Sequence, residues 1–303
     1  MNAILKLILT IGFVSTLLGA SAQTTLQVVT KTIEKTLNYK KNYSLHINGE
    51  KAEIVLDSWD KDKISVKIEL VAKHPELAIA EKDLEYFKYV SERIGKKIYL
   101  RNYIAVPKGM EKPTSKYKAS FKLMVPKNCE VVLSNNFGNA QINDLHGHLK
   151  VDSKFCKLDL KNLRGEINID SNFGDIKGDQ LSGVVSIKSN RSNITLSHLE
   201  GKYKIKSKYG VIRINSDEEL QNLGIDAEKT DIHFYNQELG GYQYALISDH
   251  GKIIIPDKMN LDFDQITDYT KKASSKGNKE TTVNIHTSFG DIIIEENANK
   301  KAP

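Results

Sequence analysis

Two short stretches pair a glycine with an aspartate after an aromatic residue, an arrangement that can hold a phosphate or a metal ion. They are SNFGDI at residues 171–176 and SFGDII at residues 288–293. A phosphate-binding loop needs several glycines ahead of a helix N-terminus, and usually a lysine. A strand-like run follows here instead, so the sequence does not favour nucleotide binding.

Calcium is the second candidate, because "FGDIKGDQLSG" places Gly174-Asp175 and Gly178-Asp179 within one short segment. Calcium-binding repeats need acidic oxygens from successive repeats. The position after the corner glycine is instead mixed along the chain: Asn139, Lys157, Asp175, Asn193, Val211, Lys252 and Asp291. We therefore interpret these aspartates as solvated turn residues and expect no metal site.

A pair of carboxylates raises the possibility of glycoside hydrolysis. Asp152 and Asp170 occupy equivalent positions in adjacent repeats, which predicts a backbone separation of about 4.8 Å. Retaining glycosidases hold two carboxyl groups about 5–5.5 Å apart. The same column continues as Lys188 and Lys206, which is typical of a charged surface. Catalysis is therefore the less favoured interpretation.

The histidines and serines predict no catalytic constellation. His146 and His148 flank a corner glycine without a third ligand in register, and His198 lies three repeats further along the same side. Zinc chemistry needs at least three protein ligands. A ladder of serines is better explained by short side chains that bond the corner backbone: Ser153, Ser171, Ser189 and Ser207. We predict no catalytic, cofactor-binding or metal residue and no cofactor, and the sequence identifies no ligand-binding residue.

A period of 18 residues explains where these side chains must lie. One ladder of corner residues is Phe137, Phe155, Phe173, Arg191 and Tyr209, and a second runs through Gly147, Gly165, Gly183 and Gly201. Two runs with alternating apolar residues fill each unit, which indicates strands with one buried face. Such units stack in parallel and bury a continuous core. We therefore predict an all-β parallel solenoid whose corner glycine allows the turn and whose aromatic residue stacks on its neighbours.

The pattern also predicts the domain organisation. We expect an N-terminal β-rich cap over residues 23–126 and a β-solenoid over residues 127–296. Within the cap, apolar residues at three- and four-residue spacing predict an amphipathic helix near residues 75–93. Within the solenoid, residues 256–282 form an insertion whose Lys-, Ser- and Gly-rich half is expected to be exposed and mobile, and residues 243–255 are expected to precede the last coil. Residues 297–303 form a polar tail.

The first residues predict export. Lys6 precedes an apolar stretch, and Ala20-Ser21-Ala22 gives a cleavage site after Ala22, so residues 1–22 are interpreted as a signal peptide. No later stretch is expected to span a membrane. The formal net charge is +6, but its lysines are spread along strands and do not form the clustered basic face of a nucleic-acid-binding protein. We expect a secreted, periplasmic or cell-envelope protein with no nucleic-acid partner.

Two corner positions give sharper expectations. Cys129 and Cys156 lie one and a half coils apart, so they should occupy opposite corners and form no disulfide, since a bridge needs Cα atoms within about 7 Å. Arg191 replaces an aromatic residue in the first ladder, so its guanidinium should lie between Phe173 and Tyr209.

These features together resemble a known family. "SLHINGEKAEIVLDSWDKDKISVKIEL", followed by a predicted helix and by coils with Ser-x-Phe-Gly corners, is similar to the bacterial putative-adhesin family, a domain of unknown function. The resemblance implies a surface or periplasmic β-solenoid without established catalytic residues. We expect a non-enzymatic adhesin-like or scaffold protein that binds an extended partner, a glycan or an envelope protein. The alternatives are an envelope regulatory or stress module that acts through a protein partner, and a polysaccharide-degrading β-helix.

Overall fold

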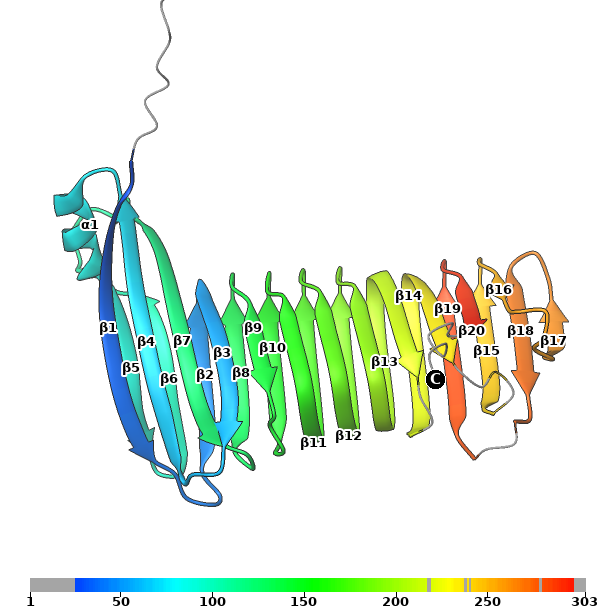
Figure 1. Cartoon of the computed structure of the whole chain (residues 1–303). Helices are drawn as coiled ribbons and strands as arrows, with labels where there is room; N and C mark the ends of the chain where they lie inside the picture. The colour runs from blue at the N-terminus through cyan, green and yellow to red at the C-terminus, as the bar shows by residue number, and fades with distance from the viewer. Residues whose placement is uncertain (1–24, 217–218, 237–238, 240, 278–279, 297–303) are drawn as a thin grey trace, which may run out of the picture.

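A computed structural model describes residues 25–216, 219–236, 239, 241–277 and 280–296. The predicted signal peptide and the predicted polar tail lie outside these residues. The described chain contains one helix, and its strands stand side by side in a long rack (Figure 1). The predicted all-β solenoid is therefore confirmed. In the described residues, no helix has the length and apolar character needed to cross a membrane.

The regular coils occupy the middle of the rack. Their strands are β8 (Glu130–Asn136), β9 (Ala140–Asn143), β10 (Leu149–Lys154), β11 (Leu158–Asn172), β12 (Ile176–Asn190), β13 (Ile194–Ser216) and β14 (Leu220–Asn236). Each full coil has two runs. One set of runs forms face 1, which includes residues 158–161 and 176–179, and the other forms face 2, which includes residues 167–172 and 185–190.

The register of the coils confirms the 18-residue period. On face 2, Leu149 pairs with Ile167, and Ile167 pairs with Val185. The period lengthens between β13 and β14, where Gly201 pairs with Leu220 and, after a register shift, Lys202 pairs with Asn222. Alternate residues of both faces point inward and form one continuous apolar core, which supplies the burial that a single coil cannot provide.

The corners are built differently from the sequence interpretation. The left-handed residue is the aromatic one, with φ of 56° at Phe155 and 60° at Phe173, although a side chain disfavours this conformation. Gly174 has no positive φ. A Cβ at this position would collide with the backbone oxygen of Cys156 in the preceding coil. At this corner the interpretation of the glycine as the turn-forming residue is therefore wrong, because glycine is required here for close approach of two coils. At the opposite corner Gly165, Gly183 and Gly201 have positive φ, from 95° to 117°, and there the glycine does allow the turn.

The N-terminal end of the core is closed by a further group of strands. They are β1 (Gln27–Asn38), β2 (Ser44–Glu50), β3 (Ala52–Trp59), β4 (Lys63–His74), β5 (Phe87–Ile94), β6 (Lys97–Ile104) and β7 (Lys116–Pro126). β2 and β3 pair in parallel with β8 and β9, so both faces continue into this region. β1, β4 and β7 pair antiparallel, and α1 (Leu77–Leu84) packs against β1 and β4.

The helix is shorter than predicted. α1 ends at Leu84, and residues 87–94 form strand β5. β5 pairs antiparallel with β6, so that Phe87 lies opposite Ile104 and Ile94 lies opposite Lys97. A turn at Gly95, with φ of 60°, joins the two strands. The prediction of a helix to residue 93 is therefore wrong, because the cross-strand partners of Phe87 and Val90 decide their conformation and their helical spacing does not.

The C-terminal coils do not follow chain order. Their strands are β15 (Gln243–Asp249), β16 (Ile253–Ile254), β17 (Asp262–Ile266), β18 (Thr270–Ser275), β19 (Thr282–Ser288) and β20 (Ile292–Glu296). β19 pairs with β14 on one side and with β15 on the other, so the last strands of the chain occupy an interior position (Figure 1). The expectation that residues 243–255 precede the last coil of the stack is therefore wrong, because β15 lies beyond β19 in the stack.

The predicted insertion also contains regular structure. β17 and β18 form an antiparallel hairpin, and β18 pairs antiparallel with β15 at the far end of face 2. The described part of this segment thus covers the end of the stack, where an unpaired β15 would expose its backbone groups.

Candidate functional site

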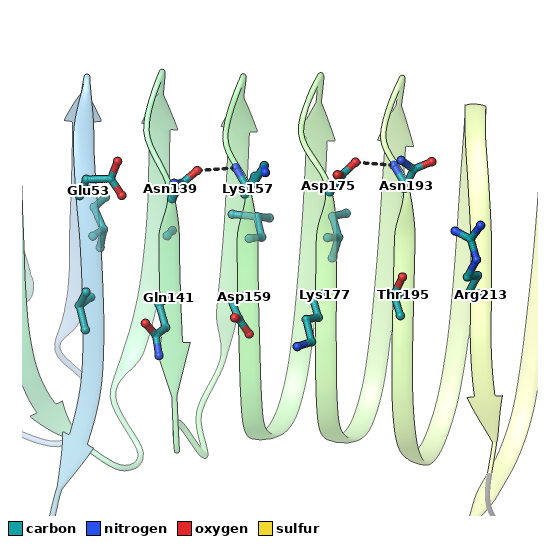
Figure 2. Close-up of a pocket in the computed structure, with 15 residues that line it drawn as sticks. Glu53, Asn139, Gln141, Lys157, Asp159, Asp175, Lys177, Asn193, Thr195 and Arg213 are labelled. Carbon is teal, nitrogen blue, oxygen red and sulfur yellow. Dashed lines mark hydrogen bonds between the residues drawn. The ribbon is translucent and has the colours of Figure 1, made fainter. Parts of the chain in front are cut away.

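A groove of about 670 Å³ crosses several coils on face 1. Figure 2 shows its labelled side chains on successive strands, in two rows that cross the strands. Each row runs along the stack of coils and is called a column here. The column next to the corner contains Glu53, Asn139, Lys157, Asp175 and Asn193, and the other contains Gln141, Asp159, Lys177, Thr195 and Arg213. These columns arise because equivalent outward residues of stacked coils lie one above another, about 4.8 Å apart.

The column next to the corner is a structural device. Asn139 Oδ1 accepts a hydrogen bond from the backbone N–H of Lys157 at 3.2 Å, and Asp175 Oδ1 accepts one from Asn193 at 3.0 Å (Figure 2). Asn193 Oδ1 then accepts a hydrogen bond from the N–H of Val211 at 3.1 Å. Asp175 thus fastens one coil to the next, which explains the aspartate of the SNFGDI motif without a bound cation.

The second column is free to face a ligand. Gln141, Asp159 and Lys177 are exposed and pair in register across β9, β11 and β12. Their amide, carboxylate and ammonium groups alternate between hydrogen-bond donors and acceptors. Such a strip can bind an extended polar chain, but it does not converge on one reacting atom.

Face 2 carries a second groove of about 940 Å³, which contains the predicted carboxylate pair. Asp152 and Asp170 are register partners, as predicted. Asp170 accepts a hydrogen bond from Asn172 at 3.2 Å and pairs with Lys188 at 3.4 Å. The pair therefore belongs to a network of neighbouring charges along the face.

The corner between the faces forms a continuous stack. The rings of Phe137 and Phe155 lie 5.0 Å apart with 3° between their planes, and those of Phe155 and Phe173 lie 4.8 Å apart. The guanidinium of Arg191 lies 5.2 Å from the Phe173 ring and 5.7 Å from the Tyr209 ring. The prediction that Arg191 shares this column is confirmed. These stacks offset part of the cost of the left-handed corner conformation.

The serine ladder lies just inside this corner and is buried. Ser171 Oγ donates to the backbone oxygen of Gly174 at 3.4 Å, which confirms the predicted bond to the corner backbone. Ser153 also bonds Ser171 at 3.1 Å, and Ser189 bonds Ser207 at 3.0 Å. The hydroxyls therefore link successive coils, and they are not placed as nucleophiles.

Several histidines form separate pairs with carboxylates, but His146 does not, and its buried Nε2 has no hydrogen-bond partner among the described residues. His148 lies 3.3 Å from Glu166, and His198 lies 2.7 Å from Asp179. His286 bridges two coils, since Nδ1 lies 3.4 Å from Asp226 and Nε2 lies 3.0 Å from Asp249. The hydrogen bond from His286, and then that from Thr270, lowers the pKa of Asp249. Within the residues described, no group of three or more His, Cys, Asp or Glu side chains is arranged so that it could hold a metal ion.

Cys129 and Cys156 are both buried and unbridged, as predicted. The backbone of each cysteine is in close contact with a corner glycine of the next coil. Cys129 contacts Gly147 in this way, and Cys156 contacts Gly174. Burial raises the pKa of Cys129 to about 12, and burial also raises the pKa of Cys156. Both thiols therefore remain protonated and are poor nucleophiles at neutral pH.

The sequence interpretation missed one concentration of charge. Lysines alternate with buried residues on β13, and all four are exposed on face 2: Lys202, Lys204, Lys206 and Lys208. The signal was present in the string KYKIKSK, but averaging lysine over the chain concealed that four of them lie on a single strand.

Comparisons with known proteins identify relatives of the fold. A family model described as Toastrack DUF4097 matches residues 42–295, which confirms the resemblance inferred from the sequence. No curated protein matches the chain.

Three solved structures are similar to the chain at 12 to 13% identity. They are described as "a putative cell adhesion protein" from Clostridium sporogenes, "a putative adhesin" from Parabacteroides merdae and a "putative lipid binding protein" from Parabacteroides distasonis. The matches cover 89%, 88% and 88% of this chain and 100%, 96% and 96% of the three, with TM-scores of 0.25, 0.35 and 0.32. TM-scores this low carry no argument about function.

Proposed function

The chain belongs to the Toastrack DUF4097 family, and from that premise we propose that it is a non-enzymatic, extracytoplasmic protein of adhesin-like or scaffold type. It binds an extended partner, a glycan or an envelope protein, along its solenoid faces. The observation that carries this proposal is the repetition of outward polar columns over many coils, as in the column from Gln141 to Arg213 (Figure 2). Stacked repeats of this kind create extended binding surfaces.

The distribution of charge supports binding over hydrolysis. A retaining glycosidase needs one carboxyl group to donate a proton and one to act as the nucleophile. Asp170 is already bonded to Asn172 and Lys188, and the grooves on both faces are lined by residues of several coils. An extended surface that uses many weak contacts fits this arrangement better than a single reacting centre does.

A protein partner is the second candidate, and the far end of the rack favours it. The β17–β18 hairpin exposes large apolar side chains, with Phe263 41%, Ile266 71% and Tyr269 67% exposed. Exposed apolar residues at one place often mark an interaction site. This end suits an envelope regulatory or stress module that contacts another protein, whereas the polar grooves suit a glycan.

The experiment combines a glycan array with a pull-down from envelope extracts, both with the purified chain. Retention of a defined polysaccharide or envelope protein, with the polysaccharide recovered uncut, is the expected result. Cleavage of a retained polysaccharide would overturn the non-enzymatic assignment. Failure to retain any glycan or envelope protein would contradict the proposed binding function.

A further inference from the structure

Four lysines form a row across face 2. Lys202, Lys204, Lys206 and Lys208 point outward from β13, and Tyr203, Ile205 and Ser207 between them are buried at 0 to 2% exposure. Alternate residues of a strand lie about 6.6 Å apart, so the row extends for about 20 Å. The burial of the intervening residues fixes the direction of all four side chains.

The first two lysines of this row, Lys202 and Lys204, have no opposite charge beside them in register. In register, Lys202 lies between Val184 and Asn222, and Lys204 lies between Ser186 and Gly224. These neighbours are neutral. Two ion pairs lie in this region: Lys188 pairs with Asp170, and Lys208 pairs with Glu228 at 2.8 Å. Among the residues described, Lys202, Lys204 and Lys206 take part in no ion pair.

Lys206 has one cationic and one acidic neighbour in register, Lys188 and Asp226. Asp226 is 3.4 Å from His286 of the next strand. The row therefore presents at least three ammonium groups whose charge is not matched by a bonded carboxylate. Such a concentration attracts anions, and its range is limited by salt.

A hollow of about 460 Å³ lies directly beside the row. Lys204 and Lys206 line it together with Asn222, Gly224, Asn284 and His286. The hollow is deep at Gly224 because glycine has no side chain. An added Cβ would lie 3.8 Å from its nearest neighbouring atom, so a side chain would fit in this space. The hollow and the 940 Å³ groove share Lys206, Asp226 and His286, so the depression continues along the face.

We propose that this row and hollow, named here the lysine row site, bind an acidic polysaccharide whose sugars carry carboxylates. The inference rests on the proposed function and adds the chemical class of the glycan. The ammonium groups of Lys202, Lys204 and Lys206 pair with the carboxylates, and a sugar ring enters the hollow above Gly224. Asn222 and Asn284 line the hollow; the Asn222 amide already donates to Thr282 Oγ1, so its oxygen, together with the Asn284 amide, is offered to sugar hydroxyls.

The surroundings favour a polysaccharide over an anionic membrane. Membrane-surface binding combines basic residues with large apolar side chains that enter the interface. Of the neighbours of the row on β12, Val184 is apolar and Ser186 and Asn190 are polar. The hollow is lined by apolar residues, Ala245 and Ile247 among them, as well as by Asn222 and Asn284, and none of its described lining residues is a Phe, Tyr or Trp. Hydrogen-bonding side chains around the cations fit a hydroxylated polymer better than they fit lipid chains.

The test measures binding of fluorescent oligogalacturonate to the full chain at low and at physiological salt. The methyl-esterified oligomer serves as the uncharged match. The triple variant Lys202→Gln/Lys204→Gln/Lys206→Gln is expected to bind the acidic oligomer about tenfold more weakly, since several exposed ion pairs are lost together. The control triple Lys82→Gln/Lys108→Gln/Lys112→Gln removes the same charge at exposed positions outside both grooves and is expected to change affinity less than about twofold.

Three results would overturn the lysine row site. The first is an equal loss of affinity for the acidic oligomer in the two triple variants. The second is binding of the esterified oligomer as tight as that of the acidic one. The third is binding of anionic lipid vesicles by a chain that does not bind the acidic oligomer. If the chain then binds a neutral glycan or an envelope protein, the proposed function survives and only the acidic site fails. If it retains nothing, both fail. The substituted lysines are all exposed, and far-UV circular dichroism checks that each variant is folded.

Discussion

The ring of His250 stacks on the ring of Phe289, with 4.6 Å between ring centroids and 4° between planes. The two residues belong to β15 and β19 corners that are neighbours in space but are separated in the chain by the β17–β18 hairpin. The same corner stack that joins consecutive coils in the middle of the protein therefore also joins coils that are out of chain order.

Cross-linking tests this order. Asn284 is the register partner of both Gly224 on β14 and Ala245 on β15. We expect the pair Gly224→Cys/Asn284→Cys to form a disulfide on mild oxidation, because facing strands bring Cα atoms within the required range. The pair Gly224→Cys/Ala245→Cys, which chain order would place side by side, should not cross-link. Peptide mapping distinguishes these bridges, and the opposite outcome would show that β15 follows β14 directly.

A glycine at the aromatic corner is required for coil spacing. In Gly174→Ala, the new Cβ meets the backbone oxygen of Cys156, so we expect the free energy of unfolding to fall by about 1–3 kcal/mol. Gly224→Ala is the matched control, since its Cβ would have 3.8 Å of space and should change stability by less than about 0.5 kcal/mol. Urea denaturation measures both, and equal stability would refute the close-approach explanation.

The aspartate of the same corner is predicted to act through its acceptor oxygen. Asp175→Asn should be tolerated, because Asn139 and Asn193 make the equivalent bond with an amide oxygen. Asp175→Ala should cost about 1 kcal/mol. The exposed Asp159→Ala is the control and should be near neutral. A calcium-dependent melting temperature that is lost in Asp175→Asn would contradict this role and indicate a cation site.

Arg191 is predicted to be exchangeable with the residue type of its column. Arg191→Phe extends the ring stack between Phe173 and Tyr209 and should change stability by less than about 0.5 kcal/mol. Arg191→Glu loses the cation–ring contacts and should cost about 0.5–1 kcal/mol. Thermal unfolding compares the two variants. Failure of Arg191→Phe to fold would mean that the stack does not accept a ring at this coil.

The two thiols should be unreactive until the chain unfolds. Burial raises the pKa of Cys129 to about 12 from an ordinary value of 9.0, so its contribution to stability is complete below about pH 9 and is lost as the pH rises towards 12. We expect no labelling by a thiol reagent in the folded protein at pH 8 and two thiols after denaturation. Zero thiols after denaturation would indicate a disulfide and a different register.

Much of the stack was predictable because it repeats. The positions of Phe155, Phe173 and Arg191 fix the register of three coils, and the structure reproduces their stacking. The role of Gly174 was not predictable in the same way, because the clash that excludes a side chain involves the backbone of another coil. A pattern within one coil does not record such a contact.

The two ends were harder to predict because their partners are not periodic. Phe87 and Val90 lie at helical spacing, yet both lie in β5, whose partner β6 begins only after Gly95. The place of β19 between β14 and β15 has no local sequence signal, because β14 and β15 offer similar alternating partners. On the candidate site, the string KYKIKSK already showed alternation, but its neutral neighbours became visible only with the register of β12 and β14.

The interior position of β19 sets the order in which the protein can be completed. A chain synthesised from its N-terminus can add β8 to β14 coil by coil as each segment emerges. β15 emerges next, but its native neighbour β19 lies beyond the β17–β18 hairpin. The far end of the rack is therefore finished only when nearly the last described residues arrive, so a prematurely terminated chain retains the early coils and leaves β14 as an open edge. The late segment of β19 and β20 therefore closes the stack between β14 and the strands β15 and β16.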